Sequence, residues 1–421
     1  MKVLWLCNNA PGVVRSALSG KQESQVNWLD HVLQDLLNQG ITLRILYRGS
    51  GAPGQIDAQF SYAPVPETPA HIYQPQLEDR FRRELWDFQP DVIHSWGVEY
   101  HHALAMVNAA EKEGMLPRIT ASIQGLCCRI APHYTDGLPA SALRCRTLRD
   151  MIRHDGILAQ QKQYTQRGEL EIEALGKLGH VIGRTEWDRK NALEINPNVQ
   201  YHHCGETLRD VFYTDQWAYS RCRKHRIFAS SCAYPVKGFH ILLEALAIVR
   251  KEYPDAEVTV TGRPFAAADL KSRMRRNGYE KYLSSLVKRN KLENAVHFVG
   301  HLSAQDMKQA YLDANVFVLS STMENSPNAL GEAMLLGMPC VASNAGGIPD
   351  MLADGREGLI YGESQDADAL ARCLLQVLTA PDGGTALGQA ARARALHTHD
   401  AAANAAALVG IYQTILKGDA P

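Results

Sequence analysis

The sequence lacks the cysteine pattern of a disulfide framework or a zinc knuckle. Nine cysteines are present, an odd number, and none of them has CxxC spacing, although Cys127 and Cys128 are adjacent. Disulfide-rich secreted domains and structural zinc sites both need regularly spaced cysteines. A reducing, cytoplasmic setting is therefore expected.

Long apolar runs and an excess of charge of one sign are also missing. No run of 18 apolar residues occurs, and the opening "MKVLWLCNNAPG" is too short in its apolar part for a signal peptide, so neither a membrane span nor a leader is expected. The formal net charge is −1 with 21% charged residues, which gives no bias toward polyanions. Nucleic acid is not an expected partner.

What is present is a regular alternation of strand-like and helix-like segments. Apolar residues at Val26, Leu29, Leu33 and Leu36 mark one face of a helix that Gly40 ends, and a second helix is expected around 100–113. Short β-branched runs predict strands at 3–8, 42–48, 91–97, 118–125, 180–185, 226–232, 257–262, 296–301, 316–321, 340–344 and 358–362. Such alternation predicts an α/β fold with parallel sheets covered by helices on both faces.

A chain of 421 residues is too long for one ordinary core, so two doubly wound, Rossmann-like domains are expected. We predict an N-terminal domain over 1–206, a C-terminal domain over 207–399, and a last helix at 400–421 that crosses back to the N-terminal domain. Ligands of such sheets bind beyond the carboxyl ends of the strands. A cleft between the two sheets is the expected site.

The stretch "MENSPNALGEAMLLGMPC" (323–340) places two glutamates, with seven residues between them, around a helix start. With Ser326 as N-cap and Pro327 as the first helical residue, the amides that follow would form an anion site. These amides belong to Asn328, Ala329 and Leu330.

The two glutamates flank that anion site on opposite sides. Glu332, inside the helix, suits a pair of hydroxyls such as those of a ribose, and Glu324, ahead of it, suits the hydroxyls of a group beyond the phosphates. A nucleotide-diphospho-sugar has that order of groups. From spacing alone, Glu324 as a partner of the helix dipole and Glu332 as a solvated helix residue stay open as the alternative.

The run "ENSPNALGEAMLLGMPCVASNAGGIPD" resembles the E-x7-E region of the family 4 retaining glycosyltransferases, which have the two-domain GT-B fold. The resemblance extends to "DGREGLIYG" (354–362) and to the Lys-Gly segment "YPVKGFHILLEAL" (234–246), and "GRTEWDR" (183–189) is similar to a polysaccharide- and lipid-linked glycan assembly branch. It is strong over 226–365 and weaker over 1–180.

The resemblance implies a role for each matching residue. Glu324 would contact the transferred sugar, and Glu332 would hold the ribose. Lys237, together with Ser326 and the amides at 328–330, would hold the diphosphate, and the backbone at Gly300 and His301 would border the base. The donor would bind in the C-terminal domain and the acceptor on the N-terminal side, with no metal and no cofactor.

Two departures from the family pattern concern the phosphate contacts. Family members often have an arginine where this chain has Cys232, so one phosphate contact is either missing or supplied elsewhere, with Arg184 and Arg263 as the candidates. The glycine pair often found after the first strand is missing too, and the nearest candidates are Gly12 and the run Ser19-Gly20-Lys21.

On the acceptor side, Gln124 stands where many relatives have a histidine. Glutamine hydrogen-bonds a sugar but cannot act as a base. In the family's front-face mechanism the leaving phosphate takes the acceptor proton, so catalysis survives this change. His94, at the end of its predicted strand, is a second candidate beside its alternative as a structural residue.

The function implied is transfer of a hexose-type sugar from a nucleotide-diphospho-sugar to a hydroxyl of a glycan or lipid-linked acceptor. A non-catalytic nucleotide-binding partner of a glycan-assembly enzyme and a sugar-nucleotide 2-epimerase remain as alternatives. An arginine-rich stretch over 142–169 is open to two interpretations, a solvated helix face or a surface for anionic lipid. Under the second, the protein would sit peripherally at the inner face of the cell membrane.

Overall fold

The computed structural model describes residues 1–20, 28–265 and 274–418. Lys21 and Val26, named above, lie outside the described residues. The chain forms two compact units: the first holds Met1–Arg129, Tyr164–Arg209 and Thr398–Pro421, and the second holds Ile130–Gln163 and Asp210–His397. The segment 130–163, assigned above to the N-terminal domain, thus groups with the second unit, and the last helix groups with the first.

The first unit is built on an eight-stranded sheet in the order β3-β4-β2-β1-β5-β6-β7-β8. All neighbours pair in parallel except β3, which is antiparallel to β4. The strands are β1 (Lys2–Cys7), β2 (Thr42–Arg48), β3 (Gly54–Gln55), β4 (Phe60–Val65), β5 (Val92–Trp96), β6 (Ile119–Ser122), β7 (His180–Gly183) and β8 (Gln200–His203).

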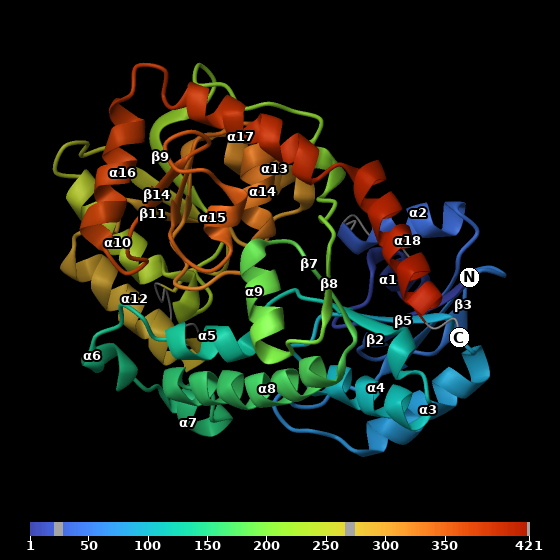
Figure 1. The fold of residues 1–421 in the computed structure, drawn as a ribbon. Coiled ribbons are helices and arrows are strands. Elements are labelled where there is room, and N and C mark those ends of the chain that lie inside the picture. The colour runs from blue at the N-terminus through green and yellow to red at the C-terminus, as the bar shows by residue number, and fades with distance from the viewer. Residues whose placement is uncertain (21–27, 266–273, 419–421) are drawn as a thin grey trace. The chain divides into compact units, whose positions relative to one another are not determined.

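Helices cover both faces of this sheet, and alternate residues of β1 enter two separate cores. Leu4 and Leu6 pack with α3 (Gln76–Phe88), α4 (His101–Lys112), α8 (Ile157–Lys177) and α9 (Glu186–Ile195). Val3 and Trp5 pack with α1 (Gly12–Ser19), α2 (Trp28–Asn38) and the last helix, α18 (Ala401–Gly418). In Figure 1, α18 lies beside α2. This period of two is what a parallel strand buried on both faces requires.

The second unit has a six-stranded, fully parallel sheet in the order β11-β10-β9-β12-β13-β14. Its strands are β9 (Arg223–Ala229), β10 (Glu257–Val260), β11 (Val296–Phe298), β12 (Ala314–Leu319), β13 (Cys340–Ser343) and β14 (Leu359–Tyr361). Its main helices are α10 (Phe239–Val249), α12 (Gly278–Arg289), α13 (Ala304–Leu312), α14 (Asn328–Leu336), α16 (Ala367–Thr379) and α17 (Thr385–Thr398) (Figure 1).

Short helices complete the connections of the described chain. They are α5 (Cys127–His133), α6 (Ala140–Leu143), α7 (Leu148–Arg153), α15 (Ile348–Met351) and the 3-10 turns at Leu116–Arg118, Asp210–Phe212 and Pro235–Lys237. No helix within the described ranges is long and apolar enough to cross a membrane.

Each sheet has one point at which the chain reverses its direction of strand addition. In the first unit the chain passes from β1 outward to β2 and β4, then returns to add β5 on the other side of β1. In the second unit it passes from β9 to β10 and β11, then returns to add β12 beside β9. Ligands of open α/β sheets bind at the carboxyl ends of the strands at such points. The loops after β1, β5, β9 and β12 are therefore where a site is sought.

Candidate functional site

Lys237 and Glu324 meet at the reversal point of the second sheet. Lys237 ends the 3-10 turn that follows β9, and Glu324 lies in the loop that follows β12. The Lys237 Nζ is 2.5 Å from the Glu324 Oε1, which also accepts a hydrogen bond of 2.7 Å from Ser321 Oγ. The lysine side chain is one-third exposed and the glutamate side chain only 12% exposed. The pair is thus oriented by the protein and still open to a ligand on the lysine side.

Two glycines allow the backbone to approach closely on either side of this pair. Gly238 has φ +63°, and a Cβ placed there would lie 1.8 Å from the Ser320 carbonyl oxygen. Gly346 has φ +58°, and a Cβ there would lie 1.8 Å from the carbonyl oxygen of Glu324. The next amide, of Gly347, donates to that same oxygen at 3.0 Å. Glycine is therefore needed at both positions for two reasons. The positive φ disfavours other residues, and any side chain would collide with the backbone of the loop after β12.

The start of α14 differs from the sequence-based expectation. The N-cap position is Pro327, not Ser326, and it makes no side-chain cap hydrogen bond. Ser326 is buried and its Oγ contacts the Met351 Sδ at 3.5 Å. The Leu330 amide, expected to be free, donates to the Pro327 carbonyl at 3.0 Å, because the first turn tightens around the proline.

The other amides of this first turn differ from Leu330. Among the described residues the Ala329 N–H has no backbone hydrogen-bond acceptor, whereas Asn328 already interacts with another group of the chain. One orphan amide at a helix start still favours an anion, since the helix dipole adds to it. The anion site at the start of α14 thus offers fewer backbone amides than the three expected from the sequence.

Glu332 is a buried carboxylate, with 6% of its surface exposed. It lies on the second turn of α14, and it has a polar partner within the chain. The alternative that Glu332 is a solvated helix residue is therefore wrong. A buried charge is retained in a protein only where it is paired or has a ligand to meet.

Neither arginine suggested as a substitute at Cys232 is free to bind phosphate. Burial raises the pKa of the Cys232 thiol to about 12, so it stays neutral, and its Sγ contacts the Thr261 carbonyl at 3.7 Å. The Arg263 guanidinium is bound by the Glu280 carboxylate, with Nε 2.8 Å from Oε1. Arg184 is in the first unit, where Glu206 neutralises it. With a neutral cysteine at position 232, Lys237 is the cationic side chain of the loop after β9 that we expect to bind phosphate.

The remaining predicted donor residues are loop positions. Gly300 has φ +72° and its carbonyl accepts a hydrogen bond of 2.9 Å from the Gly262 amide, while His301 is exposed. Gly20 ends α1 in the left-handed conformation, in the first unit. Ahead of it, the amides of Gly12 and Val13 are already capped by the Asp30 carboxylate at 3.1 and 3.0 Å. The start of α1 is thus occupied by an anion of the chain itself.

His94 is a core residue, not a group that meets a substrate. It is fully buried in β5, where its Nδ1 is 2.7 Å from the Tyr412 hydroxyl and its Nε2 is 2.8 Å from the Ser122 Oγ. Burial lowers the pKa of His94 to about 3, so the ring is neutral. The strand-end position suggested a reactive histidine, but β5 extends to Trp96 and keeps His94 inside the sheet.

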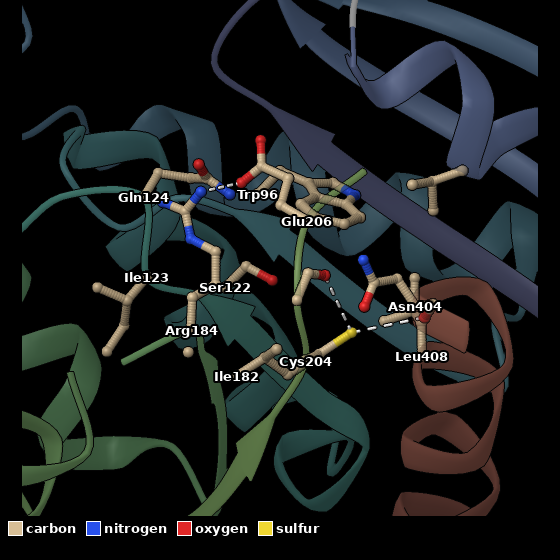
Figure 2. Close-up of a pocket in the computed structure, with 13 residues that line it drawn as sticks. Trp96, Ser122, Ile123, Gln124, Ile182, Arg184, Cys204, Glu206, Asn404 and Leu408 are labelled. Carbon is tan, nitrogen blue, oxygen red and sulfur yellow. Dashed lines mark hydrogen bonds and ion pairs between the residues drawn. The ribbon is translucent and has the colours of Figure 1, made fainter. Parts of the chain in front are cut away.

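Gln124 and Arg184 line a small pocket of the first unit at the carboxyl ends of β6, β7 and β8 (Figure 2). Arg184 turns its guanidinium toward the Glu206 carboxylate, and the two form a buried ion pair (Figure 2). The pocket has a volume of about 20 Å³. That is room for a water molecule and not for a sugar ring.

A polar cluster at the reversal point of the first sheet was missed by the sequence analysis. Asn8, directly after β1, donates to the Glu99 Oε2 at 3.0 Å and contacts the His102 Nε2 at 2.9 Å. Beside them two guanidiniums lie over the Tyr100 ring, with the Cζ atoms of Arg48 and Arg167 at 5.2 and 4.7 Å from its centroid.

The signal for this cluster was available in the sequence. Polar residues stand at the end of the predicted strand 3–8, at "NN" (8–9), and shortly after the predicted strand 91–97, at "EYHH" (99–102). His94 lies inside its strand, whereas these residues lie beyond the ends of β1 and β5. Arg167 was counted in the arginine-rich stretch, but its Nε donates to the Glu99 carbonyl at 2.7 Å, so it belongs to this cluster.

Metal-ligating groups do not gather anywhere in the part of the chain that the structure describes: no three His, Cys, Asp or Glu side chains converge there. All nine cysteines are free thiols.

Comparison with known proteins finds a family model that resembles part of the second unit. Residues 222–394 match the family described as "Glycosyl transferases group 1". The chain is 31% identical over 162 residues to spore coat protein SA of Bacillus subtilis, covering 38% of this chain and 41% of that protein. It is 31% identical over 147 residues to the amylovoran biosynthesis glycosyltransferase AmsK of Erwinia amylovora, covering 34% and 33%. The chain therefore matches less than half the length of these relatives.

Solved structures match over the whole chain at low identity. Sucrose-phosphate synthase of Thermosynechococcus elongatus has a TM-score of 0.74 at 16% identity, with all of both chains covered. Anabaena Alr3699/HepE, solved with UDP and glucose, has a TM-score of 0.68 at 15% identity, covering 98% of this chain and 100% of the other. Together with the two parallel-sheet units, these neighbours confirm the expected α/β fold class, GT-B.

Proposed function

We propose that the protein is a retaining glycosyltransferase that moves a hexose-type sugar from a nucleotide-diphospho-sugar to a hydroxyl of a glycan or lipid-linked acceptor, without a metal or cofactor. The observation that carries the proposal is the Lys237–Glu324 pair, 2.5 Å apart at the reversal point of a sheet whose sequence matches a glycosyltransferase family. A nucleotide-sugar donor is further supported by Anabaena Alr3699/HepE, solved with UDP and glucose and with UDP-glucose.

Lys237 and Glu324 divide the work at the donor. An ammonium has three donors, so Lys237 can keep its contact with Glu324 and still hold a diphosphate oxygen. Charge that grows on the leaving diphosphate is then stabilised by Lys237 and by the start of α14. Glu324 faces the positive charge that develops on the sugar, and Glu332 holds the ribose hydroxyls. No step needs a side-chain base, since the leaving phosphate oxygen takes the acceptor proton.

The acceptor is proposed to bind on the first unit, at the cluster of Asn8, Glu99, Tyr100 and His102. The side-chain amide of Asn8 and the carboxylate of Glu99 offer a donor and acceptors for sugar hydroxyls. The buried His102 ring contacts Asn8 and stacks on Tyr100, so these two rings orient the polar groups and do not meet the sugar. Gln124 and Arg184, in a pocket of about 20 Å³, are assigned a supporting role behind that surface. The free cysteines fit a reducing, cytoplasmic location.

The donor assignment is tested by thermal shift with UDP, GDP, ADP and their sugar conjugates, with and without EDTA. A ligand at about 100 times its dissociation constant adds about 2.7 kcal/mol of stability. We expect one nucleotide to raise the melting temperature and EDTA to leave that rise unchanged. A rise that EDTA abolishes would contradict metal independence, and no rise with any nucleotide would contradict the donor site.

The two alternative functions are separated by the products formed with the nucleotide that binds. A transferase releases nucleoside diphosphate when acceptor is added, and an epimerase instead changes the sugar while it remains on the nucleotide. A non-catalytic partner binds the nucleotide and does neither. The neutral Cys232 thiol and the paired Arg263 are the features that favour the non-catalytic alternative, and turnover with the natural acceptor would exclude it.

A further inference from the structure

The segment between α6 and α8 presents large apolar side chains to solvent. On the short helix α7, Leu148, Met151 and Ile152 are 62%, 55% and 71% exposed. Their spacing of three and four residues puts all three on one face of the helix. Met274, from another part of the second unit, is 64% exposed and lines the same groove, with a volume of about 370 Å³. Soluble proteins rarely expose a large contiguous apolar patch unless it binds another protein, a ligand or a membrane.

Within residues 143–158, the exposed charged side chains are all arginines. Arg144, Arg146 and Arg153 are exposed, and none of the three forms an ion pair with the residues that the structure describes. Neither acid of the segment offsets these arginines. Asp150 is buried and forms the capping box at the start of α7 with Thr147. The Asp155 carboxylate accepts hydrogen bonds from both terminal nitrogens of Arg149, at 3.0 and 2.9 Å.

Specific contacts fix the backbone of this segment. The capping box of Thr147 and Asp150 fixes the start of α7, and His154 ends it in the left-handed conformation. The Cys145 carbonyl packs so closely on Gly278, at the start of α12, that a Cβ there would lie 2.0 Å from it. The apolar face is therefore displayed by a fixed support, and the exposure of its side chains is a property of the fold.

We propose that this segment, residues 143–158, is a membrane-docking surface that binds bilayers containing anionic phospholipid. Leu148, Met151 and Ile152 enter the boundary between headgroups and acyl chains, and Arg144, Arg146 and Arg153 meet the lipid phosphates. Apolar side chains flanked by basic ones are the composition of an interfacial element, which lies on a membrane and does not span it. The docking adds a location to the proposed function and does not rest on it.

The test is co-sedimentation of the full-length protein with vesicles of phosphatidylcholine alone and of phosphatidylcholine with 30% phosphatidylglycerol. We expect at least tenfold tighter binding to the anionic vesicles at low salt, and weaker binding at about 0.5 M salt, where charges are screened beyond about 4 Å. Wild-type protein that fails to sediment with anionic vesicles would overturn the proposal.

Paired variants separate the apolar from the charged contribution. L148S/I152S should lose at least tenfold in affinity for anionic vesicles, while Ile172→Ser, an exposed isoleucine on α8, should not. R146Q/R153Q should lose the preference for anionic lipid, whereas Arg83→Gln, an exposed arginine on α3, should keep it. Unchanged binding in both double variants would overturn the proposal.

Two further measurements keep the outcomes distinct. Nucleotide binding by thermal shift should be the same in L148S/I152S as in the wild type, since these residues lie outside the donor site, so a failed donor assignment would not affect the docking result. Sedimentation velocity tests whether the patch binds a second copy of the chain. A dimer that L148S/I152S dissociates, together with no vesicle binding, would assign the patch to self-association and overturn membrane docking.

Discussion

At the scale of single residues, one carboxylate oxygen of Glu324 makes two polar contacts within the protein, and these contacts determine the expected effect of replacing Glu324. Its Oε1 accepts from Lys237 and from Ser321, so the second oxygen remains for a substrate. We expect Glu324→Gln to lower kcat by roughly 10²–10³-fold, the usual cost of one preorganised stabilising group. Nucleoside diphosphate affinity, measured by calorimetry, should stay within a few-fold, because Lys237 is freed and not lost. Equal loss of both would contradict the role given to Glu324.

Glu332 should behave in the opposite way. Its carboxylate is buried within α14 and is assigned to the ribose, so Glu332→Ala should weaken nucleotide binding by at least tenfold. Glu332→Gln, which keeps the shape and one acceptor oxygen, serves as the conservative comparison and should lose less. Calorimetric titration with the nucleoside diphosphate measures both, and an affinity unchanged in the alanine variant would remove the ribose assignment.

At the scale of loops and elements, the site depends on glycines that let two loops touch. Gly346→Ala would place a Cβ 1.8 Å from the Glu324 carbonyl oxygen, and the loop that carries Glu324 would have to move. Gly355→Ala is the matched control, since Gly355 has φ +70° but no atom within 4 Å of such a Cβ. Both variants should lose about 1–2 kcal/mol of stability through backbone strain, and Gly346→Ala should lose more because of its clash with the Glu324 carbonyl. Only Gly346→Ala should also lose activity, and equal activity in the two would contradict this account.

The elements themselves were largely predictable. All eleven strands expected from β-branched runs are present within a few residues, since parallel strands buried on both faces are continuous apolar runs. The three missed strands break that rule: β3 has two residues, β4 contains Pro64, and β8 is the polar run "QYHH". The segment 130–163 could not be assigned from the sequence, because its grouping with the second unit depends on long-range contacts such as that of the Asp136 carbonyl with His240.

The site was predictable where it depends on the local chain and not where it depends on packing. The approach of Lys237 to Glu324 follows from the ends of neighbouring strands, although 86 residues separate them along the chain. The cluster around Tyr100 needed the sheet order, which sets β5 next to β1. The burial of His94 needed Tyr412, which arrives from the far end of the sequence. Capping of α1 by Asp30 likewise has no local signal.

At the scale of the whole molecule, buried histidines set how stability depends on pH. Burial lowers the pKa of His94 and His102 to about 3 and that of His240 and His399 to about 4, below the usual value of about 6.5. Below pH 6.5 the unfolded chain therefore binds protons at these four sites that the folded chain does not, and stability falls as the pH falls.

Two buried carboxyls act in the opposite direction. Burial raises the pKa of Glu171 to about 7 and that of Asp188 to about 6, so between about pH 4 and these values the folded chain binds the extra proton and gains stability as the pH falls. Burial also lowers the pKa of His101 to about 4 and raises the pKa of Glu99, so at least five histidines oppose three carboxyls. The unfolded chain therefore binds more protons than the folded chain near pH 5, and each extra proton is worth about 1.4 kcal/mol per pH unit.

The melting temperature should therefore drop by roughly 5 °C or more between pH 7 and pH 5. His240→Asn should flatten this drop, because it removes one of the buried histidines, and His301→Asn, which changes an exposed histidine, should leave it unchanged. Calorimetric scans of the three proteins at several pH values measure the slope independently of any loss of absolute stability. A melting temperature that is flat or rises toward pH 5 in the wild type would mean that the carboxyls outweigh the histidines and that acid instead stabilises the fold.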